Sequence, residues 1–117
     1  MLLRKILSEF REIIEGIEVL QFEVAGPSSR IKLRVDLRNG SRPFAREIIL
    51  EGRQRKYAYH WKDAEGRLLA RWDNADHWPE IATSPRHKHI GDEKNVVTSD
   101  ATSLEEVLGI IRAIVRT

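Results

Sequence analysis

The chain carries a segment in which residue types suited to acid–base chemistry on a phosphate lie close together. His87, Lys88 and His89 form a triplet that follows Arg71 and Asp73 in the sequence. Cleavage of RNA through its own 2′-hydroxyl needs a base, an acid for the leaving oxygen and cations beside the phosphate. An imidazole titrates near about 6.5 and suits either proton transfer, while guanidinium and ammonium groups bind phosphate. We therefore expect His87 or His89 to move protons, Arg71 and Lys88 to hold phosphate, and Asp73 to orient a histidine.

A second group of residues could position the substrate. Tyr57, Tyr59 and Trp61 alternate along one predicted strand, and aromatic rings stack on unpaired bases. We expect Tyr59, together with Glu47, to complete the catalytic group. The remaining expected substrate-binding residues are polar or aromatic side chains near this segment, namely Tyr57, Asn74, Arg34, Lys32 and His77.

Two other interpretations of the same residues stay open. The His-x-His spacing of His87 and His89, with His77 and Asp73, is compatible with a metal site and a metal-dependent nuclease. Alternatively, the chain is a non-catalytic module that binds nucleic acid or a partner through a basic sheet face, with Asp73-Asn74 as a strand-end cap and the histidine triplet as a polar surface loop. We favour the metal-independent enzyme and expect no cofactor.

These residues require a hairpin to position them. Asp63, Ala64, Glu65 and Gly66 match a type I turn whose last position needs a positive φ. If Asp63 pairs with Arg67, then Tyr59 faces Arg71 and Tyr57 faces Asp73. Side chains alternate along strands, so one face is predicted to collect Tyr57, Tyr59, Trp61, Leu69, Arg71 and Asp73.

Upstream strands should support that face. Residues 30–38 alternate between apolar and charged side chains, and Asn39-Gly40 predicts a two-residue hairpin loop. With a three-residue loop at 52–54, that register aligns Lys32, Glu47, Tyr59 and Arg71 on the face away from the core. The same register puts Arg46 and His60 on the core face, and a one-residue change in a loop would invert every later side chain.

Helical patterns flank the strands. An apolar stripe runs from Leu2 to Ile17, and Ser103 with Glu106 forms a capping box before a second stripe that ends near Val115. Residues 18–25 predict a strand, and 88–90 and 96–97 could add short ones. We predict an α+β fold, an antiparallel meander of about five strands with N-terminal and C-terminal helices packed on one face.

Composition favours a single domain over residues 1–117. The chain has no long apolar run and no signal-peptide pattern, so we expect a cytoplasmic protein without membrane contact. The absence of cysteine excludes a thiol nucleophile and thiolate metal ligands. Lys and Arg concentrate in residues 30–71, whose surplus could attract a phosphate backbone.

At KYAYHW, DAEGRLLARWDNADHW and SPRHKHIG the chain resembles the TumE-type family, the toxin partner in prokaryotic toxin–antitoxin pairs. The family pattern combines a YxYH-like strand, an acid-x-Gly turn, an arginine followed by an aromatic residue and Asp-Asn, a histidine, and a closing Pro-x-His-Lys-His. It falls here on Tyr57, Tyr59, His60, Gly66, Arg71, Trp72, Asp73, Asn74, His77, Pro85, His87, Lys88 and His89, with an upstream Arg-Glu at Arg46 and Glu47.

Two positions depart from that pattern. Trp72 stands where the family usually has tyrosine, and Trp78 stands where it has a second histidine, so this chain has no ring hydroxyl at position 72 and no histidine at position 78. The resemblance implies a toxin with a cognate antitoxin that usually carries a helix-turn-helix. The expected activity is a metal-independent endoribonuclease that blocks translation, in a chain for which a homo-oligomer is also possible.

Overall fold

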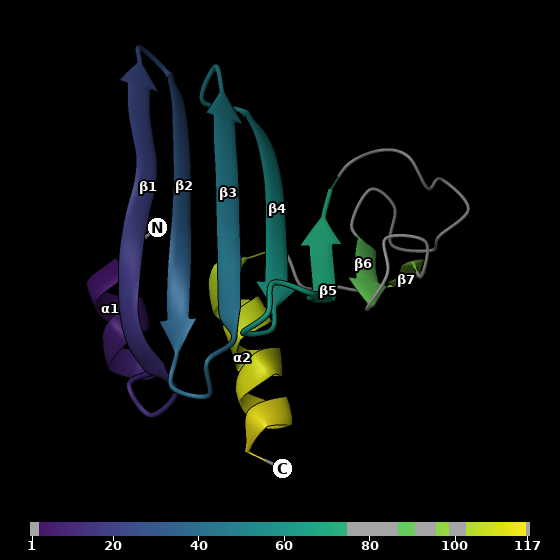
Figure 1. Cartoon of the computed structure of the whole chain (residues 1–117). Coiled ribbons are helices and arrows are strands. Elements are labelled where there is room, and N and C mark those ends of the chain that lie inside the picture. Colours follow the sequence, from purple (N-terminus) through teal and green to yellow (C-terminus); the bar gives the residue numbers. More distant parts are fainter. Residues whose placement is uncertain (1–2, 75–86, 91–95, 99–102, 117) are drawn as a thin grey trace.

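Seven antiparallel strands form one sheet in chain order, with two helices on one side of it (Figure 1). The computed structural model describes residues 3–74, 87–90, 96–98 and 103–116. The elements are α1 (Leu3–Glu9), β1 (Ile14–Ala25), β2 (Ser28–Leu37), β3 (Arg42–Leu50), β4 (Gln54–Lys62), β5 (Leu68–Asp73), β6 (His87–Ile90), β7 (Val96–Thr98) and α2 (Leu104–Val115). The predicted α+β meander with terminal helices is confirmed, and the two short strands β6 and β7 extend its sheet.

The N-terminal helix is shorter than its apolar stripe predicts. Backbone N–H groups of Ile13 and Ile14 both donate to the carbonyl of Phe10, at 3.0 and 2.9 Å, and close the helix with a turn. Ile14 then pairs with Leu37 of β2. Because β-branched residues favour strands, Ile14 and Ile17 belong to β1 and do not prolong the helix along the apolar stripe.

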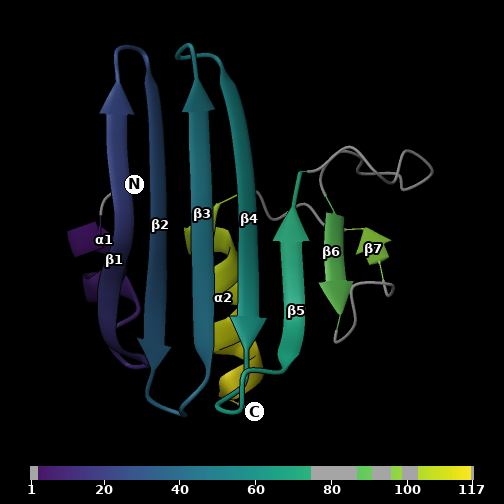
Figure 2. The same cartoon turned by 45° about the horizontal axis from the view of Figure 1, so that its top comes forward.

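Both helices pack on the same face of the sheet, α1 behind β1 and α2 behind β3 and β4 (Figures 1 and 2). The core between them contains buried side chains of both layers, including Ile6, Phe10, Leu33, Val35, Tyr59, Trp72, Leu104, Val107, Leu108 and Ile111. The predicted capping box is confirmed, since Ser103 Oγ accepts from the Glu106 N–H at 3.2 Å and donates to its carboxylate. Ile114, predicted in the buried stripe, is instead 49% exposed. None of the described helices is long and apolar enough to cross a membrane.

The β2–β3 hairpin has a three-residue loop, so the predicted two-residue loop is wrong. Leu37 N–H donates to Ser41 O and Gly40 N–H donates to Leu37 O, both at 3.0 Å, and Gly40 has φ +90°. Asn39 Oδ1 accepts from the backbone and the hydroxyl of Ser41, which stabilises the longer loop. Lys32 therefore pairs with Arg46 and not with Glu47.

The β4–β5 hairpin has the predicted turn and an unpredicted bulge. Asp63 N–H donates to Arg67 O at 2.9 Å, as expected. One step further, Lys62 pairs with Leu68 but Trp61 pairs with Ala70, so Leu69 is an extra residue. The bulge shifts the later register by one. Compared with a regular hairpin, the residues after it therefore lie on the opposite face of the sheet.

Candidate functional site

The face of the sheet opposite the helices, which we call the open face, is rich in cations. Pairing of Lys32 with Arg46 and of Arg42 with Lys62 places basic residues from three strands on this side. The basic residues at these open-face positions of β2, β3 and β4 are Arg30, Lys32, Arg34, Arg42, Arg46, Lys56 and Lys62. This concentration gives the open face the charge that attracts a phosphate backbone.

The centre of the candidate site is His60 with Arg71 and Asp73. His60 of β4 pairs with Arg71 of β5, and Ala58 pairs with Asp73 in the adjacent row. Arg71 Nε lies 2.9 Å from Asp73 Oδ2, and the two side chains are 22% and 3% exposed. Because residues two apart share a face of a strand, the ion pair runs along the open face beside the histidine.

Strand β6 adds the two histidine positions of the triplet to the same two rows. His89 pairs with Arg71, and His87 pairs with Asp73. The cross-strand order is therefore His60, Arg71, His89 in one row, and Ala58, Asp73, His87 in the next. The structure thus brings three histidine positions to one arginine and one aspartate.

His60 is the site residue that sequence reasoning missed. The predicted register had placed His60 and Arg46 on the core face, whereas both belong to the open face. The predicted register put two polar side chains in the core. Burying a charge without a partner is costly, so this placement already indicated that the predicted register was wrong.

Glu47, Tyr57 and Tyr59 lie on the helix side, so the predicted face shared by Tyr59 and Arg71 is wrong. Tyr59 pairs with Trp72, and both are fully buried. Its hydroxyl donates to Glu47 Oε1 and accepts from Arg55 Nη2 at 2.7 Å, while Arg55 also binds Glu47 at 2.9 Å. Glu47 pairs with Tyr57 and not with Tyr59, because the β3–β4 loop comprises residues 51–53 and not the predicted 52–54, yet the Glu47 carboxylate still reaches the Tyr59 hydroxyl on the helix side.

Burial controls the protonation of that cluster. Desolvation, reinforced by the Glu47 carboxylate, raises the pKa of the Tyr59 phenol well above its usual range. Burial disfavours the charged guanidinium of Arg55, yet Tyr59 and Glu47 together hold its pKa above the ordinary value. The rings of Tyr57 and Tyr59 stack with centroids 5.3 Å apart, and the Arg55 guanidinium lies 4.8 Å from the Tyr57 ring centroid. In this cluster the Tyr59 phenol therefore stays neutral beside the charged guanidinium of Arg55.

The other predicted binding residues occupy different places. Asn74 donates to Arg55 O at 2.7 Å and accepts from Tyr57 N–H at 2.9 Å, so its amide extends the β4–β5 ladder. Lys88 pairs with Trp72, so its position belongs to the helix side of the sheet, whereas the positions of His87 and His89 belong to the open face. Lys32 is exposed on the open face. His77 lies outside the described residues.

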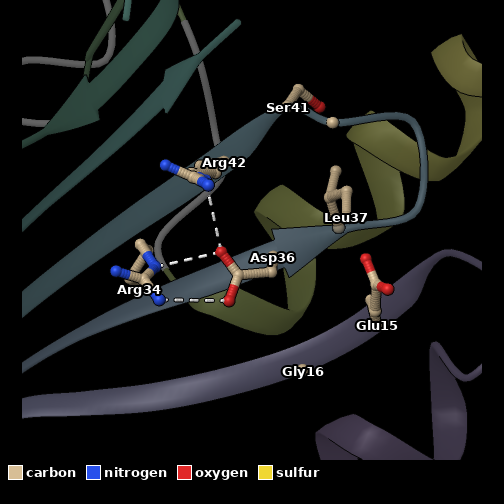
Figure 3. A pocket seen from close by; sticks show the side chains of 8 residues that line it. Glu15, Gly16, Arg34, Asp36, Leu37, Ser41 and Arg42 are labelled. Carbon is tan, nitrogen blue, oxygen red and sulfur yellow. Dashed lines mark hydrogen bonds and ion pairs between the residues drawn. The ribbon is translucent and has the colours of Figure 1, made fainter. Parts of the chain in front are cut away.

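Arg34 belongs to a charged network at the end of the open face near the β2–β3 loop (Figure 3). Asp36 Oδ1 lies 3.0 Å from Arg34 Nε and 3.3 Å from Arg42 Nε, beside a hollow of about 360 Å³. Arg34 also binds Glu18 at 2.7 Å, and its hydrogen bond to Asp36 raises the pKa of the guanidinium. This network cross-links β1, β2 and β3 and compensates much of the positive charge there.

Among the side chains that the structure describes, no group of three histidine, aspartate or glutamate residues is arranged to hold a metal ion. The predicted metal alternative involves His77, which lies outside those residues.

Comparison with known proteins identifies a family. The family model described as "Toxin TumE" matches residues 3–116, which is nearly the whole chain and includes every strand of the candidate site. Searches of curated proteins and of solved structures found no match. The extent of the family match shows that the chain belongs to the TumE toxin family.

Proposed function

We propose that this toxin is a metal-independent endoribonuclease that blocks translation by cutting RNA on the open face between β4, β5 and β6. The observation that carries the proposal is the row of His60, Arg71 and His89, with Asp73 and His87 in the next row. General acids, bases and a phosphate-binding cation are the groups that such a reaction needs.

The proposed reaction is an internal transfer at phosphorus. The ribose 2′-oxygen attacks the neighbouring phosphorus as one imidazole removes its proton, and the 5′-oxygen leaves with a proton from a second imidazole. The products are a 2′,3′-cyclic phosphate and a 5′-hydroxyl end. We assign one transfer to His60 and the other to His87 or His89, with Arg71 neutralising the charge that develops on the phosphoryl oxygens.

Asp73 acts in this scheme as a positioning residue. Its nearly buried carboxylate lies 2.9 Å from Arg71 Nε, which restricts the guanidinium to one orientation. A fixed cation stabilises the transition state without reorganising during the reaction. Exposed cations at the open-face positions of Lys32 and Arg46 would hold the RNA backbone on either side of the cut.

The test is cleavage of a radiolabelled single-stranded RNA by the purified chain in excess EDTA. Cyclic-phosphate products are expected, with a rate about 10²- to 10⁴-fold lower for His89→Ala or Arg71→Ala. Arg53→Ala, which changes an exposed residue in the β3–β4 turn, is the matched control and should cleave normally. Activity that is lost in EDTA and restored by a divalent metal would contradict the metal-independent reaction and favour the metal-dependent nuclease.

The extent of the basic face favours a second candidate, a toxin that binds RNA without cutting it. Cations occupy the open face from β2 to β4, well beyond the histidine rows. In that case RNA would bind with an affinity that falls with salt, and no cleavage products would form.

Family membership also implies a partner protein. Membership in a toxin family implies a cognate antitoxin. We propose that this antitoxin carries a helix-turn-helix, which sequencing of the adjacent reading frame would test directly.

A further inference from the structure

The outer edge of β1 has no neighbouring strand in the described sheet. β1 is the first strand in the sheet order, and its residues from Glu18 to Ala25 are exposed apart from the partly buried Gln21. Phe22 and Val24 are 64% and 63% exposed. An open strand edge presents unpaired N–H and C=O groups, which proteins usually protect with lysine, proline or a short length. β1 has twelve residues and contains neither lysine nor proline.

The edge has two chemically different sides. Phe22 pairs with Ile31 and Val24 pairs with Ser29, positions on the helix side of the sheet beyond the region that the helices bury. Gln21 and Glu23 take the alternate positions on the open face. The β1–β2 ladder is irregular at Glu15 and at Leu20, and Gln21 to Ala25 then pair regularly. A strand added here would need apolar side chains on one side and polar ones on the other.

Charge excludes a second copy of this chain as the best occupant. β1 contains three glutamates, of which Glu18 binds Arg34, and it contains no lysine or arginine. Two β1 edges placed side by side would add the glutamates of a second β1 to one seam and would bring no lysine or arginine from that strand, and like charges across strands are destabilising. A basic strand would meet complementary charge at the same positions.

We propose that β1 accepts an extended segment of a partner protein in which apolar residues alternate with lysine or arginine. The segment would pair its backbone with the free edge, place its apolar side chains beside Phe22 and Val24, and direct its cations toward Glu23. The partner's cations would lie at the β1 end of the open face, and RNA would use the basic positions of β2, β3 and β4. The proposal does not depend on nuclease activity.

The probe is a synthetic ten-residue peptide that alternates valine and lysine, added to the ¹⁵N-labelled full chain and followed by NMR. Amide shifts should concentrate in residues 17–25 and weaken with salt. Glu23→Lys should weaken binding about fivefold, because it replaces attraction with repulsion. Phe22→Ser should weaken binding about tenfold, because it removes an apolar contact. The matched controls Glu65→Lys, in an exposed turn, and Ile114→Ser, on α2, should bind as the unchanged chain does.

Three results would overturn the proposal. The first is no shift in residues 17–25 at millimolar peptide, and the second is equal binding there of a peptide with glutamate in place of lysine. The third is a dimer of the free chain in sedimentation that Phe22→Ser dissociates, which would make a second copy the occupant. RNA cleavage measured on Phe22→Ser should be unchanged, so failure of the nuclease proposal is detected separately.

Discussion

Arg71 and Asp73 form the pair on which the candidate site is built. The Asp73 side chain is 3% exposed and lies 2.9 Å from Arg71 Nε. A carboxylate buried this deeply is stable only beside a cation or several hydrogen-bond donors. The pair therefore gives Arg71 a fixed orientation next to His60, which an arginine on a solvated strand would lack.

Replacing Asp73 with asparagine tests that positioning role. The amide keeps the size of the side chain but loses the charge that restrains Arg71, and misplacement of a catalytic group costs about 10²-fold in rate. We expect single-turnover RNA cleavage to fall by about that factor while RNA affinity, measured by fluorescence anisotropy, does not weaken. Loss of affinity in proportion to rate would show that Asp73 only maintains the fold.

Tyr59 allows a pH prediction on the other face of the sheet. Desolvation and Glu47 raise the pKa of its phenol, so the folded state favours the neutral form. The stability from this phenol is fully present below its ordinary pKa of 10.0 and is lost as pH rises above that value. Tyr59→Phe removes a buried hydroxyl that bonds charged groups and should cost about 1.5–3 kcal/mol at neutral pH. Urea unfolding should show that this cost shrinks above pH 10.0, and a cost independent of pH would contradict the account.

At the scale of elements, the bulge in β5 decides which residues meet. Leu69 opposes no residue of its own on β4, so Ala70 pairs with Trp61 and Arg71 with His60. If Leu69 instead paired with Trp61 in a regular ladder, Arg71 would fall opposite Tyr59 on the helix side. The bulge is thus the device that brings Arg71 and Asp73 to the open face.

Deletion of Leu69 should therefore be tolerated. It removes the unpaired residue and leaves Leu68 opposite Lys62 and Ala70 opposite Trp61 in a regular ladder. We expect the free energy of unfolding to change by no more than about 2 kcal/mol, with RNA cleavage retained.

Deletion of Ala58, a buried residue in a regular part of β4, is the control for that change. It inverts half of the strand and should unfold the chain. If deletion of Leu69 unfolds the chain as readily as deletion of Ala58, the bulge is not where the structure places it.

The elements themselves could be predicted from the sequence, but their register could not. The alternation of Leu33, Val35 and Leu37 identified a half-buried strand, and Ser103 with Glu106 identified the start of α2. Asn39-Gly40 located a hairpin, but the bonds from Ser41 to Asn39 Oδ1 select a loop one residue longer. Leu68 and Leu69 are both leucine, so no chemical difference marks the bulge.

Two one-residue errors changed the composition of the predicted site. The longer loop moved Glu47 to the helix side and Arg46 to the open face, and the bulge separated Arg71 from Tyr59. Because the side-chain period of a strand is two, the longer loop inverted the faces of β3 and β4 relative to the prediction, and the bulge returned Arg71 and Asp73 to the predicted side. The residue types of the site were predictable, whereas the partner of each residue depended on tertiary pairing.

Over the whole molecule, charge is divided between surfaces. Residues 12–25 carry four glutamates without a basic residue, while basic residues gather on the open face of β2, β3 and β4. The net charge of only +2 does not reveal this uneven distribution of charge. Local charge, more than the total, sets which ligand each surface attracts.

Salt dependence measures how many open-face cations contact RNA. For single strands, the logarithm of the binding constant falls against the logarithm of salt with a slope of about −0.7 per phosphate contact. Lys32→Ala and Arg46→Ala should each reduce the steepness by about 0.7. Arg4→Ala on α1, on the helix side of the sheet, is the control and should leave the slope unchanged. Equal slopes for all variants would show that RNA binds elsewhere.

The most direct test of the central claim, that the open face cuts RNA, compares one residue from each face. The measurement is the single-turnover rate of RNA cleavage in EDTA for His60→Ala, on the open face, and Tyr57→Phe, on the helix side. The account predicts a rate about 10²- to 10⁴-fold lower for His60→Ala and a nearly unchanged rate for Tyr57→Phe. A normal rate for His60→Ala in a folded protein would contradict it.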